Sequence, residues 1–401
     1  MSDKPALQGK LVLDLSRVLA GPWASQTLAD LGATVIKVER PGKGDDTRGF
    51  GPPFFQNADG EEISAYFMSA NRGKQSVCID IAQPQGADLV RQLAAKADIL
   101  IENFKVGDLA KRGLDYEALS MINPRLIYCS ITGFGQTGPY QHRPGYDFMI
   151  QGMTGLMSIT GDPADESGPQ KVGVALADIL TGLYSTIAIL AAIEECNQSG
   201  IGQHIDMSLL DVVTACLANQ ASNYLVSGAV PQRMGNAHPN IVPYQTFETK
   251  DAHIIVAVGN DSQFEQLCGC LDLMHLSDDV RFATNASRVE NRADLVPLLQ
   301  LAFSVKSMDE WLQALEQAGV PCGPINTIDR VFEDPQVKAR GVEMTLDGMP
   351  LVSNPIKYSR TPLDYKLAPP VLGKNTAQVL ADTLQLDAAT IDALLQSKVI
   401  A

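Results

Sequence analysis

Residues 10–135 alternate between short strand-like runs and longer segments with helical spacing, and this alternation constrains the fold more than any other feature. The expected strands are short apolar or β-branched runs at residues 10–15, 34–39, 76–81, 99–102 and 126–131. A helical segment at 23–31 separates the first strand from the second, and one at 83–97 separates the third from the fourth. Strands joined by helical crossovers pair in parallel, with helices on both faces of the sheet. The pattern therefore predicts an α/β domain built on a parallel sheet.

The character of the sequence changes twice after this region. Residues 175–195 and 208–225 are apolar runs rich in small residues, which predicts two buried helices. Strand-like runs at 244–249 and 253–258 flank a hairpin turn at Lys250–Asp251. Helices are expected at 262–271, 290–303, 308–318 and 377–396, with loops and short strands at 321–367. We expect a large domain over 1–225, completed by 331–401, and a small α+β domain over 226–330.

Composition excludes several classes of partner. The chain of 401 residues has a formal net charge of −15, which disfavours nucleic acids and anionic membrane surfaces. We find no continuous apolar run of about 18 residues and no secretory leader, so a cytoplasmic protein without membrane contact is expected. The seven cysteines form no C-x-x-C pair. They are predicted to be reduced and mostly buried, with no metal site.

The turn after the first strand is a candidate anion site. The segment Arg17-Val-Leu-Ala-Gly-Pro precedes a helix, and helix starts at the carboxyl ends of parallel strands bind anions. A plain strand-to-helix turn is the alternative. The strand is not followed by G-x-G-x-x-G, and the sequence contains no P-loop. These absences disfavour a dinucleotide-dependent oxidoreductase or an ATPase.

Basic residues follow several of the expected strands. Arg40 comes after the second strand, and Lys111 and Arg112 come after the fourth. The carboxyl ends of parallel strands share one edge, so these three side chains are candidates for binding phosphates together. Solvated surface charges are the alternative interpretation.

Three further positions are candidates for function. Asp178 lies in an apolar run, where a carboxylate is costly unless it is hydrogen-bonded or used; helix capping is the alternative. His238 lies in a loop rich in Gly, Asn and Pro, where a structural histidine is the alternative. The polar loop Gly259–Gln263 follows a strand and is either a lid or a strand-to-helix turn.

Many ordered motifs resemble those of the family III CoA-transferases. They include the Arg17–Pro22 turn, Gly32-Ala-Thr-Val-Ile-Lys-Val-Glu-Arg-Pro-Gly, Asn71-Arg-Gly-Lys, Glu102-Asn-Phe, Gly133-Phe-Gly-Gln-Thr-Gly-Pro, Asp178-Ile-Leu-Thr-Gly-Leu and Gly202-Gln-His-Ile-Asp. The resemblance extends to Leu372-Gly-Lys-Asn-Thr. It implies a Rossmann-like large domain, a small domain and an interlocked homodimer of ring-shaped subunits.

The resemblance also implies roles for individual residues. Asp178 aligns with the family's nucleophile, and Gly259–Gln263 aligns with its mobile glycine-rich loop, although it holds a single glycine. The family's CoA contacts align with Val18, Ala20, Arg40, Lys74, Asn103, Phe104 and Lys111. CoA thioesters would be substrates, with no permanently bound cofactor and no metal.

The resemblance is strongest to the succinyl-CoA:glutarate branch. A dicarboxylate is therefore expected as acceptor, with its distal carboxylate held by Arg17, Arg48 or His238. Formyl-CoA:oxalate exchange is the nearest alternative. A 2-methylacyl-CoA racemase is disfavoured, because Tyr146 stands where those enzymes carry a histidine. A CoA-binding scaffold without activity is a further alternative.

Overall fold

The computed structural model describes residues 4–163 and 168–401 and divides into two compact units. The first unit comprises Met1–Leu156, Val172–Leu225 and Gln336–Ala401, and the second comprises Met157–Lys171 and Val226–Pro335. The units differ from the expected domains in two places. The segment 157–171 belongs to the second unit, and the return to the first unit occurs at residue 336 instead of 331. Helices α6 (Leu156–Ile159) and α16 (Pro335–Ala339) lie at these two boundaries.

The first unit is built on a six-stranded parallel sheet. Its strands run in the order β5 (Lys74–Cys78), β2 (Thr34–Glu39), β1 (Leu11–Asp14), β6 (Ile99–Glu102), β7 (Ile127–Thr132) and β8 (His204–Ser208). The predicted parallel sheet is therefore confirmed. The strand order reverses between β1 and β6, which is where ligands bind in sheets of this topology.

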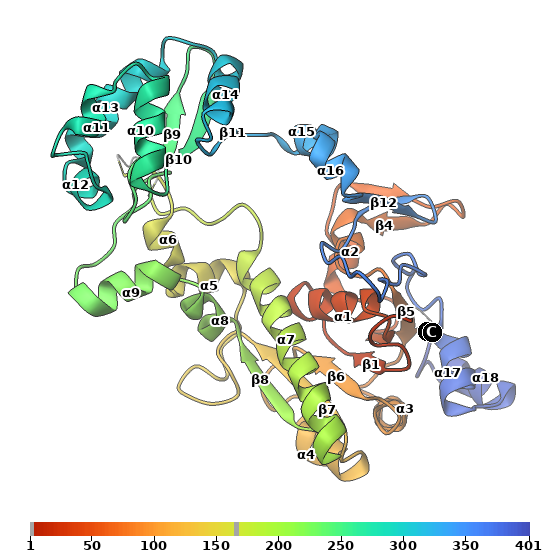
Figure 1. The fold of residues 1–401 in the computed structure, drawn as a ribbon. Helices are drawn as coiled ribbons and strands as arrows, with labels where there is room; N and C mark the ends of the chain where they lie inside the picture. The colour runs from red at the N-terminus through yellow and green to blue at the C-terminus, as the bar shows by residue number, and fades with distance from the viewer. Residues whose placement is uncertain (1–3, 164–167) are drawn as a thin grey trace. The chain divides into compact units, whose positions relative to one another are not determined.

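Both faces of the sheet are apolar because successive side chains of each strand point to opposite faces. Val12 and Ile99 pack on one face, beside α1 (Ala20–Asp30) and α7 (Leu176–Ser199), which lie next to each other (Figure 1). Leu13 and Leu100 pack on the other face. The helices on that face are α3 (Pro84–Ala94), α4 (Tyr116–Ile122), α17 (Thr376–Leu384) and α18 (Ala388–Gln396). The predicted helices on both faces are thus confirmed.

The apolar segments of the middle region fold into three helices instead of two. α7 covers the first segment, and the second is broken into α8 (Leu209–Ala215) and α9 (Ala218–Ser227), with Ala218 at φ 47°. By length and composition alone, α7 could cross a membrane. However, it buries one face, from Ala177 to Cys196, against α1 and the sheet, as the core helix of a soluble domain does.

Two hairpins form a smaller core in the first unit. They are β3 (Phe54–Gln56) with β4 (Glu62–Ser64), and β12 (Glu343–Leu346) with β13 (Met349–Val352). Ile63 and Met349 pack there with Phe67 of α2 (Ala65–Met68). The 3₁₀ helices η1 (Asp46–Gly49) and η2 (Ala110–Arg112) and helix α5 (Asp147–Met153) complete this unit. These hairpins place α2 close to the loops that carry the candidate site.

The second unit contains a three-stranded antiparallel sheet in the order β11 (Cys322–Pro324), β10 (His253–Ala257) and β9 (Tyr244–Glu248). The register of β9 and β10 confirms the predicted hairpin. Helices α10 to α15 accompany this sheet, at Asp261–Cys270, His275–Asp278, Asn285–Glu290, Arg292–Phe303, Met308–Gln317 and Ile328–Glu333. In its core Phe247 stacks on Phe303, and Trp311 meets Phe303 edge-on. All seven cysteines of the chain are free, and four of them are buried.

Candidate active site at the start of helix α7

Asp178 lies in the first turn of α7, on a partly buried position. Its carboxylate accepts no hydrogen bond from any residue in the described ranges 4–163 and 168–401. Burial, together with the nearby charge of Asp147, raises the pKa of Asp178 to about 7. Strongly perturbed pKa values are typical of functional groups. Because neither oxygen of the Asp178 carboxylate accepts a hydrogen bond from the described residues, both remain available for reaction.

Asp147 and Gln151, both on α5, hold the segment that enters α7. One carboxylate oxygen of Asp147 accepts the backbone N–H of Ala177 at 2.8 Å, and the other accepts Nε2 of Gln151 at 2.9 Å. Oε1 of the fully buried Gln151 accepts the N–H of Val172 at 2.9 Å. The backbone on the N-terminal side of Asp178 is thus fixed at two points. Gln151 could not be recognised from the sequence, because an isolated glutamine has many ordinary roles.

Tyr66 on α2 is a second residue that the sequence analysis missed. Burial raises the pKa of its phenol, and so do the charges of Asp178 and Asp147. The ring packs edge-to-face on Phe50, with 5.4 Å between ring centroids. A phenol that stays protonated near two carboxylates can donate a hydrogen bond to a negatively charged oxygen. In the sequence, Tyr66 is part of an apolar run that indicates only packing.

The turn after β1 and the turn after β6 are joined at the reversal point of the sheet. The N–H of Arg17 donates to Oδ1 of Asn103 at 2.9 Å, and Nδ2 of Asn103 donates to the carbonyl of Arg17 at 2.7 Å. The Arg17 guanidinium lies 5.7 Å from the ring centroid of Phe104. Arg17, Val18, Ala20, Asn103 and Phe104 therefore lie on two adjoining turns at this edge of the sheet.

Val18 adopts a strained backbone conformation in this turn. Its φ of 69° lies in the left-handed region, which is rare for a β-branched residue, and its N–H donates to Oδ1 of Asp45 at 3.1 Å. Helix α1 then begins at Ala20 without a side-chain cap. Its first N–H groups are thus available to an anion. Strain of this kind persists where the surrounding structure enforces it, often at functional sites.

Close packing of α7 on α1 brings Asp178 towards this turn. Gly182 has its backbone so near α1 that an added Cβ would lie 2.7 Å from the carbonyl oxygen of Ala20. Asp178 precedes Gly182 by one helical turn and so lies on the same face of α7. The carboxylate and the N-terminus of α1 therefore belong to one site in the first unit.

Lys74 and Arg48 both have partners inside the protein. The Lys74 ammonium is fully buried, 3.2 Å from Asp14 and 2.9 Å from Asn71, so it does not reach a ligand surface. Burial lowers its pKa to about 8, although Asp14 opposes this effect. The Arg48 guanidinium donates to both carboxylate oxygens of Glu39 and to the carbonyl of Pro370. Three of its five N–H donors are thus used inside the protein, and a role towards a substrate carboxylate stays a prediction.

Arg40 and Lys111 remain exposed cations after β2 and β6. Lys111 pairs with Asp108 at 2.7 Å, and Arg112 donates to the carbonyl of Asp108. Arg40 forms no ion pair within the part of the chain that the structure describes. A joint role in binding phosphates stays a prediction for these residues.

The remaining predicted residues belong to the second unit. Nδ1 of His238 accepts the N–H of Asn240 at 3.1 Å, and its ring lies 5.3 Å from that of Tyr244. The N–H of Gly259 donates to the Gln263 side chain at 2.7 Å, while Asn260 caps α10. Gly259–Gln263 is thus a capped helix start, which is the alternative the sequence analysis left open. A substrate role for His238 stays a prediction.

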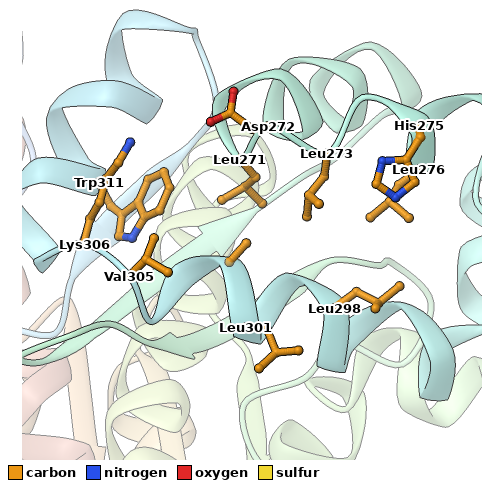
Figure 2. A pocket seen from close by; sticks show the side chains of 11 residues that line it. Leu271, Asp272, Leu273, His275, Leu276, Leu298, Leu301, Val305, Lys306 and Trp311 are labelled. Carbon is orange, nitrogen blue, oxygen red and sulfur yellow. The ribbon is translucent and has the colours of Figure 1, made fainter.

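An apolar cavity of about 410 Å³ also lies in the second unit. Figure 2 shows Leu271, Leu273 and Leu276 on one side of it and Leu298 and Leu301 of α13 on the other. None of the predicted site residues lines it. The described residues also contain no group of three His, Cys, Asp or Glu side chains suited to a metal ion. These features add no catalytic group to those around Asp178.

Comparison with known proteins identifies the family. The model of CoA-transferase family III matches residues 7–376. The chain belongs to this family. A succinate–glutarate CoA-transferase of Agrobacterium fabrum is 54% identical over 385 residues, which cover 94% of this chain and 96% of the relative. The human succinyl-CoA:glutarate CoA-transferase is 44% identical, and the match covers 100% of this chain and 91% of the human protein.

Solved structures support the same relationship. A CaiB/BaiF family protein from Brucella suis is 53% identical, with a TM-score of 0.85 over 95% of this chain and all of that protein. The resemblance to family III CoA-transferases that the motifs suggested is therefore confirmed along nearly the whole chain.

Proposed function

We propose that this CoA-transferase moves CoA from succinyl-CoA to a free dicarboxylate such as glutarate, with Asp178 as the covalent nucleophile. The observation that carries the proposal is a carboxylate without hydrogen bonds, held rigidly beside the N-terminus of α1. The named activities of the bacterial and human relatives support the choice of acids. A family III CoA-transferase specific for oxalate stays the alternative.

The proposed reaction uses Asp178 twice. A carboxylate oxygen of Asp178 attacks the thioester carbonyl of succinyl-CoA, the C–S bond breaks, and CoA thiolate leaves behind a mixed anhydride. The thiolate then attacks the aspartyl carbonyl, which releases succinate and forms an aspartyl-CoA thioester. The carboxylate of glutarate attacks this thioester and expels the thiolate again. Attack of the thiolate on the glutaryl carbonyl yields glutaryl-CoA and restores the Asp178 carboxylate.

The surroundings of Asp178 suit these steps. Each attack creates a negatively charged oxygen, and the uncapped first turn of α1 and the protonated Tyr66 phenol are the nearby donors. Activated acyl groups must be kept from water, which favours a partly buried nucleophile over an exposed one. Burial has the further effect of making the carboxylate more basic, since its pKa rises to about 7. A more basic carboxylate is a stronger nucleophile.

Arg17 is the side chain that we propose for the distal carboxylate of the acid. About half of its side chain is exposed, and it pairs with Asp46 at 3.0 Å, an exchangeable surface contact. A guanidinium can bind a carboxylate through two parallel hydrogen bonds. Arg17→Ala is expected to raise the KM for glutarate about tenfold and to leave the KM for a monocarboxylate unchanged. Equal use of both acids by wild type and variant would remove Arg17 from this role.

We also propose that the chain works as a homodimer. Leu183, Tyr184, Ile187 and Leu190 form an apolar stripe on the exposed side of α7. Apolar stripes of this kind are typical of protein–protein contacts. Interlocking of the two subunits and the cytoplasmic location are expectations from the sequence and stay predictions.

The central experiment follows isotope exchange between labelled glutarate and glutaryl-CoA in the presence of succinyl-CoA. Wild type should catalyse this exchange. In Asp178→Asn, which keeps the side-chain size, the exchange rate should fall by more than about a thousandfold. Glu316→Gln, a matched removal of a charge at an exposed site on α14, should have no effect. Mass spectrometry of the wild type during turnover should find CoA linked to the peptide that contains Asp178. Exchange with oxalate but without glutarate would favour the alternative acid.

A further inference from the structure

Glu102 is a buried carboxyl group that the proposed reaction does not use. It is the last residue of β6 and is 5% exposed. Oε2 of Glu102 accepts the backbone N–H of Phe104 at 2.7 Å, and Ser130 lies beside Glu102 as its partner on β7. No Lys, Arg or His in the described part of the chain forms an ion pair with it. One backbone hydrogen bond therefore holds a buried acid that has no counter-ion.

Ser130 connects Glu102 to His204. Its Oγ lies 2.9 Å from Nε2 of His204, at the start of β8. The imidazole is stacked on Tyr116, with 5.2 Å between centroids, and meets Tyr128 edge-on at 5.5 Å. A hydroxyl has one proton, so the directions of its two hydrogen bonds are linked. If Ser130 turns its hydroxyl proton towards the neighbouring Glu102, its oxygen is left to accept a hydrogen bond from Nε2 of His204.

The turn that Glu102 holds carries two of the predicted CoA contacts. Asn103 follows Glu102 directly, and its side chain bonds to both backbone groups of Arg17. Phe104 is tied to Glu102 through its N–H, and its ring lies beside the Arg17 guanidinium. A change at Glu102 therefore acts on both sides of the reversal point between β1 and β6.

We infer that Glu102 is a positioning residue for the CoA substrate. Its carboxylate, supported by Ser130 and His204, fixes the Asn103–Phe104 turn in the conformation that receives CoA. This inference rests on the proposed function, because Asn103 and Phe104 are CoA contacts only if the chain handles CoA.

The ionisation of Glu102 makes this role sensitive to pH. Burial raises its pKa to about 7, while the bonds from Ser130 and from the Phe104 N–H lower it. A carboxylate accepts the Phe104 N–H more strongly than a carboxylic acid does. The ionisable groups near this hydrogen-bonded set come from β7, β8, α4 and the loop after β1, namely Tyr128, Cys129, His204, Asp206, Asp115, Glu117 and Arg17. CoA affinity should therefore fall as pH drops through about 7.

The test measures the dissociation constant of CoA by calorimetry between pH 6 and 8.5, using the full-length protein. Glu102→Gln should weaken binding about tenfold at pH 8 and remove the change in affinity near pH 7. The KM for glutarate should stay the same in this variant. Glu316→Gln, at an exposed acid on α14 of the second unit, is the matched control and should bind CoA as wild type does.

A second variant keeps the inference testable if Glu102→Gln does not fold. Ser130→Ala leaves Glu102 in place but removes a donor to its carboxylate, so the midpoint of the pH dependence should move to higher pH. Wild type that binds no CoA would contradict the proposed function itself. Wild type that binds CoA, with the variants matching its affinity and pH dependence, would overturn only the role of Glu102.

Discussion

At the scale of single residues, two opposing effects set the ionisation of Asp178. The first turn of a helix stabilises a carboxylate and so lowers its pKa. Burial and the neighbouring charge of Asp147 act in the other direction and dominate, because the pKa of Asp178 is raised to about 7. Asp147 therefore has two effects: it fixes the backbone at Ala177, and it makes the nucleophile more basic.

Asp147→Asn should separate these two effects. The amide oxygen can still accept the Ala177 N–H, but the negative charge is lost, so the pKa of Asp178 should fall. Transfer requires ionised Asp178, and the acid limb of the pH–rate profile should move down by roughly half to one pH unit. Single-turnover rates between pH 5.5 and 8.5 measure the shift. A profile that coincides with that of wild type would show that Asp147 acts through geometry alone.

The same pKa predicts how stability depends on pH. Asp178 has a pKa of about 7 in the folded chain and an ordinary value of 3.8, so the folded state holds the proton more tightly. Stability is therefore lost as pH rises from about 4 to 7 and Asp178 must ionise in the folded state. Asp178→Asn should be more stable than wild type by about 1–3 kcal/mol at pH 8, and the difference should shrink at pH 5. Urea unfolding of both proteins at pH 8 and pH 5 measures this difference in the free energy of unfolding. The same difference at both pH values would contradict the prediction.

Residue roles were predictable from sequence only where the local pattern was unusual. Asp178 stood out because it interrupts an apolar run. Lys74 and Arg48 were assigned to ligands because a sequence does not show that Asp14 and Glu39 lie beside them. Tyr66 and Gln151 were missed for the opposite reason, since tertiary contacts alone bring them to the site.

At the scale of helices and strands, the contact of α1 with α7 depends on Gly182. In a helix, Gly→Ala usually stabilises by about 0.5–1 kcal/mol. At Gly182 the new methyl would lie 2.7 Å from the Ala20 carbonyl and 3.0 Å from Cβ of Trp23. Gly182→Ala is therefore expected to destabilise by about 1–3 kcal/mol and to slow transfer, because the start of α1 must move.

Gly269→Ala in α10 is the matched control for Gly182→Ala. The added Cβ at Gly269 meets only Sδ of Met274, at 3.6 Å, which is ordinary van der Waals contact. This variant should be as stable as wild type or slightly more stable, with the usual helical gain. Urea unfolding of both variants makes the comparison. A stabilising effect at Gly182 would show that the two helices can separate without cost.

The prediction of these elements depended on whether their hydrophobic pattern was distinctive. The sequence located β1, β2, β6 and β7 from their apolar or β-branched runs, but it placed the third strand at 76–81, which overlaps β5 only at residues 76–78. β8 was missed because His204-Ile-Asp-Met-Ser208 carries polar side chains at alternate positions and lies between two apolar helical segments. The break between α8 and α9 was missed as well, because the left-handed Ala218 has no local sequence signal.

At the scale of the whole molecule, α7 has apolar residues on two sides. One side packs on α1 and the sheet. Ile187, 61% exposed, lies at the centre of the apolar stripe on the other side. A helix that is apolar all round is normally buried all round. A second copy of this chain would cover the stripe, and this is the physical reason for the proposed homodimer.

Ile187→Glu should therefore reduce the dimeric species, because a carboxylate buried in an apolar contact without a partner is costly. Sedimentation velocity should give a dimeric mass for wild type and a monomeric or concentration-dependent mass for the variant. Met121→Glu is the control: Met121 is 84% exposed and belongs to α4, on the opposite face of the sheet. This control should keep the mass of wild type. A monomeric wild type would contradict the homodimer, and a fully dimeric Ile187→Glu would place the subunit contact elsewhere.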